Sequence, residues 1–313
     1  MLERKRVRRI IRVLNKIKDK PRILIWYFFL LTGYCKLAPD SLYLRLLWWS
    51  LFGKRLPLKD PQTFNEKIQW LKINDRNPMY ISMVDKFDAK QYVAAQIGKE
   101  YIIPTIGVWN SFDEIDFSKL PNKFVLKCTH DSKSCIVCKD KNKFDYLSAS
   151  GKLSKALKRN YYWRYREWVY KDIKPRIIAE DYIENDEVDG LHDYKVWCFG
   201  GKAKYIQYIS GHIGEKTYEA FYDTDWKKQD FRYINPILQG EVPRPVHLES
   251  LISAAEKLSE NMIFGRIDFY ILPDDSIKFG EITFYPNSGI KEWHPAETDL
   301  RLGEMMNIPE IGK

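Results

Sequence analysis

The sequence is poor in cysteine and has no long apolar run. Its 313 residues include five cysteines, an odd number in a chain of this length, which excludes a disulfide framework and favours a reducing compartment. Residues 23–31 are apolar, but nine residues cannot cross a hydrocarbon core that needs about 20. No small-residue cleavage site follows them. We therefore expect neither a membrane-spanning helix nor a signal peptide.

Several common catalytic motifs are also missing. The sequence contains neither a Walker A motif nor Gly-x-Ser-x-Gly, so P-loop and acyl-hydrolase chemistry have no support. Cys135 and Cys138 have the Cys-x-x-Cys spacing of some zinc sites, but the sequence has no second pair. Their strand-like surroundings fit small buried or half-buried thiols better than metal ligands.

Acidic residues are scarce at the front of the chain. Residues 1–60 hold 15 Lys or Arg and 4 Asp or Glu, a balance of +11, whereas the whole chain carries a net charge of +9. A nearly neutral body therefore follows a basic front end. This distribution favours a localised basic attachment surface and argues against a nucleic-acid groove, so no nucleic-acid partner is expected.

The front end has the composition of a membrane-surface segment. In residues 2–18, Ile10, Leu14 and Ile17 follow helical spacing among many arginines and lysines, which predicts a basic amphipathic helix. A second apolar cluster at 42–52 contains Trp48 and Trp49 and is flanked by basic residues. We expect residues 1–55 to bind an anionic membrane surface. The alternative is a helical hairpin packed on the body, with its charges simply solvated.

The body mixes helices and strands without a steady βαβ alternation, so the expected fold class is α+β. Thr63 and Glu66 form a capping-box pattern that predicts the start of a helix. Further helices are expected at 82–97, 151–171 and 247–261. Strands are expected at 101–103, 124–128, 136–138, 177–182, 194–199 and 203–208, followed by a hairpin of 265–272 and 277–284.

The hairpin carries the densest chemical signal. By the period of two, Arg266 and Asp268 share one face of the first strand, and Glu281 and Thr283 share one face of the second. Pairing these strands brings two carboxylates together, which either share a proton or bind a cation. Oxygen ligands on a rigid hairpin suit Mg²⁺. The alternative is that Arg266 pairs with the carboxylates as structural ions.

Two other segments suggest nucleotide binding. Lys127 ends an apolar strand and precedes a short polar loop, an arrangement that suits phosphate. Many strands, however, end in a lysine on a solvated edge. The strand at 177–183 turns acidic at Glu180 and Asp181, so its backbone could read an adenine edge and a nearby acid a ribose hydroxyl. An ordinary strand with solvated acids is the alternative there.

Taken together, these segments resemble the ATP-grasp superfamily over residues 60–308. More narrowly, they are similar to the TupA-like branch, named for teichuronopeptide biosynthesis and found among bacterial surface-polysaccharide proteins. The supporting segments are 63–72, Asp85-Lys86, 124–130, 193–195 and 279–284. The resemblance implies an ATP-grasp-like α+β fold with a small β lid lobe and a larger α+β lobe. The implied domains are a basic, aromatic-rich helical region at 1–60, a helical subdomain at 61–115, the lid lobe at 116–176 and the large lobe at 177–313.

The resemblance also implies ATP and Mg²⁺ as cofactors and assigns roles to residues. Lys127 and Lys86 would contact the ATP phosphates, and Asp193 and Lys195 would lie near the ribose and phosphates. Arg266, with Lys127, would serve catalysis by stabilising the transferred phosphoryl group. The adenine hinge would comprise Glu180, Asp181, Tyr182 and Ile183. The metal would be held by Asp268 and Glu281, with Thr283 and Asn287 as further ligands.

The sequence departs from the family pattern in two places. Asp131 and Lys133 occupy a loop that is Gly-rich in better-matched relatives, so this loop should close less intimately over the phosphates unless Lys133 adds its own charge. Thr283 stands where the wider superfamily has an asparagine. A threonine hydroxyl is a weaker ligand than an amide oxygen, and Asn287 is the candidate to replace it.

The resemblance implies an ATP-grasp ligase of capsule or surface-polysaccharide biosynthesis. Such an enzyme activates a carboxylate as an acyl phosphate, which an amine attacks to form an amide. A uronic acid on a lipid-linked glycan and an amino acid are a plausible pair of substrates. The expected location is the cytoplasmic, inner face of the bacterial plasma membrane. The alternatives are a glycosyltransferase of the same pathway that uses a nucleotide-sugar and a non-catalytic nucleotide-binding scaffold.

Overall fold

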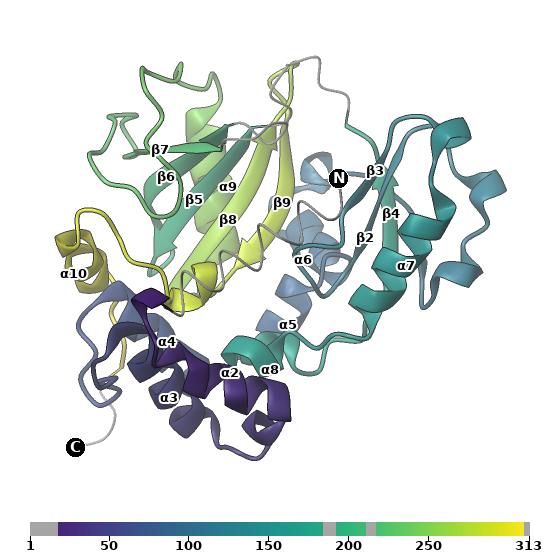
Figure 1. Cartoon of the computed structure of the whole chain (residues 1–313). Coiled ribbons are helices and arrows are strands. Elements are labelled where there is room, and N and C mark those ends of the chain that lie inside the picture. The colour runs from purple at the N-terminus through teal and green to yellow at the C-terminus, as the bar shows by residue number, and fades with distance from the viewer. Residues whose placement is uncertain (1–17, 184–191, 211–216, 310–313) are drawn as a thin grey trace.

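The computed structural model describes residues 18–183, 192–210 and 217–309. The basic helix expected at 2–18 falls outside these ranges except for its last residue. The described chain forms two lobes, each built on an antiparallel sheet, with helices beneath and between them (Figure 1). This arrangement confirms the α+β class. None of the helices in these ranges is long and apolar enough to cross a membrane.

The small lobe is a four-stranded sheet with the strand order β1-β4-β2-β3. Its strands are β1 (Thr105–Trp109), β2 (Phe124–Cys128), β3 (Ile136–Cys138) and β4 (Ile177–Asp181). Helix α7 (Tyr146–Leu157) covers the outer face of this sheet, and Leu153 packs with Leu126 and Ala179 in a separate core. Strand β1 precedes the range 116–176 expected for the lid lobe, and β4 follows it. The sheet therefore extends from residue 105 to residue 181.

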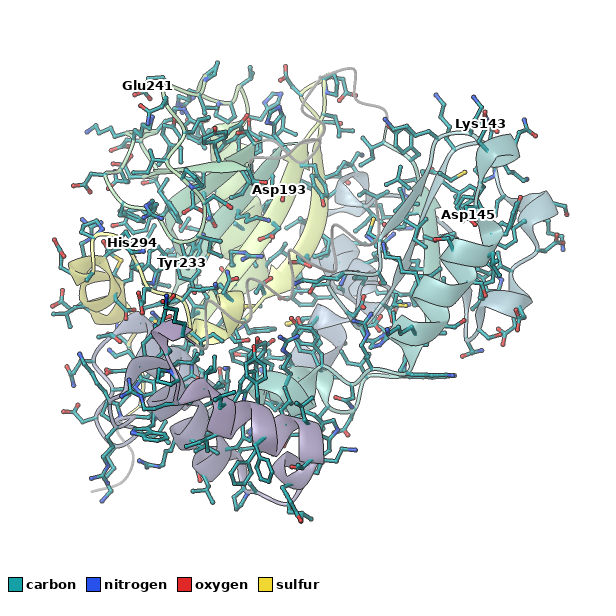
Figure 2. The ribbon with its side chains drawn as sticks, viewed as in Figure 1. Lys143, Asp145, Asp193, Tyr233, Glu241 and His294 are labelled. Carbon is teal, nitrogen blue, oxygen red and sulfur yellow. The ribbon has the colours of Figure 1, made fainter. Side chains whose placement is uncertain are left out.

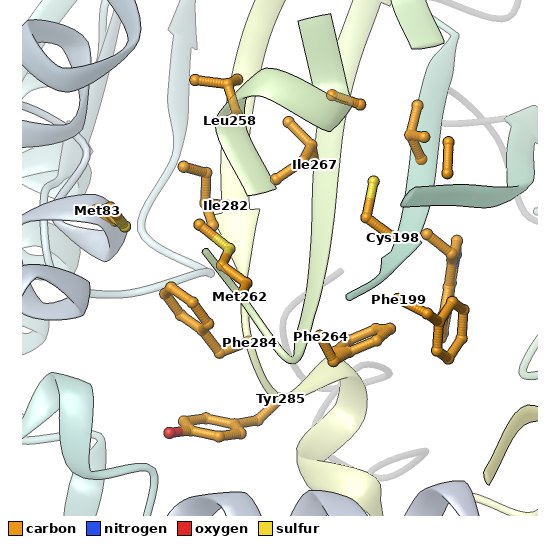
Figure 3. Close-up of a cluster of buried hydrophobic side chains, with 14 of the residues drawn as sticks. Met83, Cys198, Phe199, Leu258, Met262, Phe264, Ile267, Ile282, Phe284 and Tyr285 are labelled. Atoms are coloured by element: carbon orange, nitrogen blue, oxygen red, sulfur yellow. The ribbon is translucent and has the colours of Figure 1, made fainter. Parts of the chain in front are cut away.

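The large lobe is a five-stranded sheet with the order β7-β6-β5-β8-β9. Its strands are β5 (Asp193–Phe199), β6 (Lys202–Ser210), β7 (Tyr218–Tyr222), β8 (Phe264–Ile271) and β9 (Ile277–Thr283). Helix α9 (Leu248–Ser259) packs on one face, where Leu258 meets the core around Ile267 and Ile282 (Figure 3). Helix α10 (Glu297–Glu304) packs against α4 (Phe64–Asn74) at the edge of the lobe.

The helices before the small lobe supply one feature that the sequence pattern did not predict. Helix α4 (Phe64–Asn74) begins at the predicted capping box, in which Thr63 N donates to Glu66 Oε2 at 3.0 Å. The helix expected at 82–97 is instead two helices, α5 (Met79–Val84) and α6 (Asp88–Ile97). Asp85 Oδ1 accepts from the backbone N–H of Phe87 and Asp88 at 2.9 and 3.0 Å, so the carboxylate caps α6 and breaks the longer helix. The break places Lys86 in a loop.

The first two described helices, α2 (Ile23–Thr32) and α3 (Asp40–Phe52), pack side by side beneath the lobes (Figure 1). Trp26 Nε1 donates to Tyr43 Oη at 2.7 Å, and that hydroxyl donates to the carbonyl of Arg164 at 2.9 Å. Arg166, buried at the end of α8 (Tyr162–Tyr165), forms an ion pair with Asp40 at 3.2 Å. The segment around 161–170 therefore holds the N-terminal helices against the body.

Two further expected elements differ from the structure. The strand expected at 101–103 is wrong: a 3₁₀ turn occupies Lys99–Tyr101, and pairing with β4 starts only at Thr105, after Pro104. The helix expected at 151–171 begins earlier, because Asp145 caps α7, and it gives way to α8 and a 3₁₀ turn at Trp168–Tyr170. Strand β7 was not predicted.

Candidate nucleotide site

A cavity of about 330 Å³ lies between the two sheets. Both lobes line it, and it contains every residue expected to bind the nucleotide together with both expected metal carboxylates. These are Lys86, Lys127, Glu180, Asp181, Tyr182, Ile183, Asp193, Lys195, Asp268 and Glu281. Figure 2 shows Asp193 on the large lobe, well away from Lys143 and Asp145 on the small lobe. The apolar part of the lining includes Ile103, Val125 and Val137, which suits a flat base.

Glu180 organises the lysines on the small-lobe side of the cavity. Its Oε2 lies 2.5 Å from Lys127 Nζ, and its Oε1 lies 2.6 Å from Lys90 Nζ. Burial alone would raise the pKa of Glu180, which is 3% exposed, but Lys127 and Lys90 outweigh it and lower that pKa below its ordinary value. Burial lowers the pKa of Lys90 despite the attraction of Glu180. The carboxylate thus pairs with two ammonium groups, of which that of Lys127 lines the cavity.

The backbone positions narrow the expected adenine hinge. Glu180 is paired on both sides in the sheet, opposite Thr105 and Val125, so its backbone is committed to the ladder. Asp181 N donates to the carbonyl of Pro104 at 3.2 Å. Tyr182 and Ile183 follow the end of β4 and line the cavity. Because Asp181 is also paired in the sheet, the backbone hinge role fits residues 182 and 183, while Glu180 contributes through its side chain.

The loop after Lys127 keeps its shape through side chains rather than glycine. Asp131 is buried and accepts a hydrogen bond from Ser134 Oγ, which itself accepts from the backbone N–H of Cys128 at 2.7 Å. Lys86 Nζ donates to the carbonyl of Asp131 at 2.5 Å. The loop between α5 and α6 therefore contacts the loop that follows β2. Lys133 is exposed and lies on a second cavity rather than on this one.

The β8–β9 hairpin brings together the four residues that the period of two placed on one surface. Asp268 lies opposite Glu281, and Arg266 lies opposite Thr283. Arg266 binds Asp268 through two hydrogen bonds of 2.7 Å and reaches Glu281 Oε1 at 3.3 Å. Thr283 Oγ1 accepts from Arg266 at 3.1 Å and donates to Glu281 at 3.2 Å, so its hydroxyl orients that carboxylate. Gly280 stands at a β-bulge where a Cβ would meet the carbonyl oxygen of Asp268 at 3.1 Å.

Lys195 joins this cluster from the neighbouring strand β5. Its Nζ lies 2.6 Å from Asp268 Oδ2 and 3.0 Å from Asp193 Oδ2. Burial would lower the pKa of Lys195, but Asp268 and Asp193 together raise it above its ordinary value. Burial would likewise raise the pKa of Glu281, yet Lys86 and then Arg266 lower it. These shifts favour the charged forms of Lys195 and Glu281, whereas burial raises the pKa of Asp268 despite the attraction of Arg266 and Lys195.

The donor set suits a magnesium ion that arrives with phosphate. Across the described ranges, no three or more His, Cys, Asp or Glu side chains are grouped so that they could hold a metal by themselves. Asp268 and Glu281 offer oxygen donors from adjacent strands. Mg²⁺ is usually held by one or two carboxylates plus substrate phosphates and waters. These two residues fit that pattern, with Thr283 beside them.

A second cavity, of about 240 Å³, adjoins the first. Four residues line both: Lys86, Asp131, Ser132 and Glu281. The second cavity is also lined by Arg266, Thr283 and Asn287, so all the remaining expected site residues lie here. The boundary between the two cavities is therefore the place where a phosphoryl group could pass from one ligand to another.

A buried polar network supports the second cavity. Glu167, 6% exposed, lines the cavity and accepts a hydrogen bond from Ser288 Oγ. Lys72 Nζ, on α4, donates to the carbonyl of Ser288 at 2.8 Å and to Gln69 Oε1 at 3.0 Å. Asn287 and Ser288 have positive φ angles of 46° and 59°, a strained conformation for residues with side chains. The network holds this turn, and with it Asn287, against the cavity.

A family model described as TupA-like ATPgrasp matches residues 66–307. The chain belongs to this family. The match confirms the resemblance that the motifs suggested, and it agrees with the expected fold and with the expected class of enzyme, an ATP-grasp ligase. ATP-grasp enzymes use ATP and Mg²⁺. A search of curated proteins finds no match.

Solved structures similar to this TupA-like ATP-grasp protein are distant. D-cycloserine synthetase DcsG is 16% identical with a TM-score of 0.41, and the match covers 73% of this chain and 70% of that one. An L-amino acid ligase from Bacillus licheniformis is 13% identical with a TM-score of 0.43, over 72% and 50% of the two chains. A D-alanine–D-alanine ligase from Bacillus anthracis complexed with ATP is 16% identical with a TM-score of 0.41, over 72% and 66%. The matches span half to 70% of the length of these three proteins.

Sequence reasoning missed two residues of this TupA-like ATP-grasp protein that the structure places at the site. Lys90 shares Glu180 with Lys127, yet its only sequence signal is that it follows Lys86 by four residues. Glu167 stands in an aromatic-rich segment, and nothing local indicates that its carboxylate reaches a cavity. Both depend on contacts between segments far apart in the chain.

Proposed function

We propose that this protein is an ATP- and Mg²⁺-dependent ligase that joins a carboxylate to an amine on a bacterial surface glycan. The observation that carries the proposal is the meeting of two cavities at one charged boundary, where Glu281 lines both cavities and binds Arg266, which lines the second. A ligase that works through an acyl phosphate needs this arrangement, because the γ-phosphoryl group must leave one ligand and reach another while water is kept away.

The charged residues of the first cavity fit a nucleotide with its phosphates toward the hairpin. Ile103, Val125 and the backbone at 182–183 would hold the base, and Asp193 would lie by the ribose. Lys127, Lys86 and Lys195 would contact the phosphates. Asp268 and Glu281 would hold Mg²⁺, which supplies charge neutralisation between the phosphates.

The proposed reaction has two steps at the boundary. First, an oxygen of the carboxylate substrate attacks the γ-phosphorus, and the bond to ADP breaks. Second, the amine nitrogen attacks the carbonyl carbon, inorganic phosphate leaves and the nitrogen loses a proton. Arg266 lines the second cavity with a planar fork of donors, binds Asp268 and Glu281 of the first, and would stabilise the charge on the transferred phosphoryl group.

The glycan and membrane parts of the proposal rest on the family and on the N-terminal helices. The TupA-like family suggests a polysaccharide pathway, with a uronic acid on a lipid-linked glycan as the carboxylate substrate. The segment 161–170 lines the second cavity through Tyr161, Glu167 and Tyr170 and also binds α2 and α3. An acceptor carried on a lipid at the inner face of the plasma membrane would therefore approach beside these helices.

An ADP-release assay tests the ligase proposal. The full chain would be mixed with Mg·ATP, a panel of uronic acids and UDP-uronic acids as carboxylates, and hydroxylamine, which traps acyl phosphates as hydroxamates. ADP formation that depends on the carboxylate and is matched by hydroxamate supports the proposal. Consumption of a nucleotide-sugar without ADP would favour the glycosyltransferase instead. Nucleotide binding without turnover of any substrate would favour a scaffold.

A further inference from the structure

Helix α2 is apolar on its exposed side as well as on its buried side. Ile23 and Trp26 are buried in the core shared with α3. On the other side, Leu24, Phe28 and Leu31 are 51%, 57% and 82% exposed. Their spacing of four and three residues places them in one stripe along the helix. The outer face of a surface helix in a globular protein is normally polar, so this stripe needs a partner.

The exposed stripe continues beyond α2. Leu37 in the connection to α3 is 80% exposed, and Leu42 on α3 is 59% exposed. Helix α3 packs directly against α2, and Leu37 lies in the short connection between the two helices (Figure 1). We call Leu24, Phe28, Leu31, Leu37 and Leu42 the apolar corner.

Cations and tryptophans border the apolar corner. The guanidinium of Arg22, at the start of α2, lies 5.9 Å from the ring centroid of Trp49. Lys36, just after α2, places Nζ 5.6 Å from the ring centroid of Trp163. The first 60 residues carry a balance of +11. An apolar centre bordered by tryptophan and strong positive charge matches the chemistry of an anionic lipid interface, whereas an apolar protein partner has no use for the charge.

We propose that α2 lies in the headgroup layer of an anionic phospholipid surface and inserts Leu24, Phe28 and Leu31 into one leaflet. The helix has ten residues, about 15 Å long, so it lies in the interface and does not cross it. The rim cations, Arg22 and Lys36, contact the phosphates of the headgroups.

This placement also orients the active site, and in this respect it rests on the proposed function. The ring of Trp26 on α2 stacks against Tyr165, with centroids 6.0 Å apart. The same segment continues to Glu167 and Tyr170, which line the second cavity. With α2 on the membrane, the segment 161–170 connects the membrane-bound helix to the second cavity.

Vesicle co-flotation of the full chain tests the proposal. The probes are vesicles of phosphatidylcholine alone and of phosphatidylcholine mixed with an equal part of phosphatidylglycerol. The test variant combines Leu24→Gln, Phe28→Gln and Leu31→Gln, because glutamine keeps helix propensity, adds no charge and removes the apolar stripe. The matched control combines Leu147→Gln and Val246→Gln, whose side chains are 85% and 67% exposed at other places on the surface.

We expect the wild type and the control to float with the phosphatidylglycerol vesicles and the test variant to bind at least about tenfold more weakly, as expected from losing three large apolar side chains. Binding should also be weaker without phosphatidylglycerol. The proposal is overturned if the test variant binds the vesicles as well as the wild type does, or if the control loses as much binding as the test variant. It is also overturned if the wild type binds neither kind of vesicle. Equal binding to both lipids would overturn the role of the cations.

A nucleotide titration of the same proteins separates this proposal from the ligase proposal. Mg·ATP binding should be equal in the wild type and the test variant, because the apolar corner lies outside the residues that line the nucleotide cavity. Retained nucleotide binding also shows that the variant is folded. A wild type that binds Mg·ATP but not the vesicles would contradict the membrane proposal and leave the ligase proposal intact. A wild type that binds the vesicles but not Mg·ATP would contradict the ligase proposal and leave the membrane proposal intact.

Discussion

Glu180 is the residue whose replacement tests the electrostatic design of the nucleotide site most simply. Its carboxylate is 3% exposed and lies 2.5 and 2.6 Å from the ammonium groups of Lys127 and Lys90. The change Glu180→Gln keeps the shape and one acceptor oxygen but leaves two partly buried cations without their shared anion. Breaking a buried pair in this way costs about 3–5 kcal/mol of unfolding free energy. We expect Glu180→Gln to fall in that range.

Urea unfolding at pH 7 measures the loss, with Glu256→Gln as the control. Glu256 pairs with Lys202 at 2.9 Å, but the lysine is 70% exposed, so that change should cost less than about 1 kcal/mol. Because the folded pKa of Glu180 is lowered, its contribution is present above the unfolded pKa of about 4.3 and is lost as the pH falls through the folded value. The difference between wild type and variant should therefore shrink in acid. A cost for Glu180→Gln no larger than that of the control would refute the reasoning.

Two further changes probe the boundary and the network behind it. Arg266→Lys keeps the charge but loses the planar guanidinium that makes two hydrogen bonds to Asp268. Mg·ATP binding should persist while the rate of ADP release falls about 100-fold or more. Equal rates of ADP release in wild type and variant would show that the guanidinium has no catalytic role. Burial lowers the pKa of Lys72 from 10.5 to about 8. The unfolded chain then binds more protons than the folded chain between those pH values, so Lys72 makes stability rise from pH 8 to 10. Urea midpoints of Lys72→Met should lack this rise, whereas those of Lys204→Met, at an exposed position, should keep it.

The sequence predicted the parts of the site that depend on local pattern. The period of two along 264–283 places Arg266, Asp268, Glu281 and Thr283 on one surface, and the strands pair in that register. The capping box at Thr63 likewise needs only residues three apart. Local rules fixed these features because the interacting groups are close in the chain.

The parts that sequence reasoning missed depend on long-range contacts. The helix expected at 82–97 breaks because Asp85 caps α6 and also binds Arg176, 91 residues away. Lys90 contributes to the site only because β4 places Glu180 within ion-pair distance of it. Strand β1 was placed too early because its start is set by pairing with β4. In each case a partner distant in the chain overrides the local pattern.

Calorimetric titration of Mg·ATP into the full chain tests the central claim most directly. The proteins are the wild type, Lys127→Ala, Glu281→Ala and, as a control, Lys143→Ala, whose side chain is 85% exposed on the small lobe away from the cavity (Figure 2). We predict Mg²⁺-dependent ATP binding by the wild type and the control, and its loss in the other two variants. No binding by the wild type, or binding that neither Lys127→Ala nor Glu281→Ala weakens, would contradict the account.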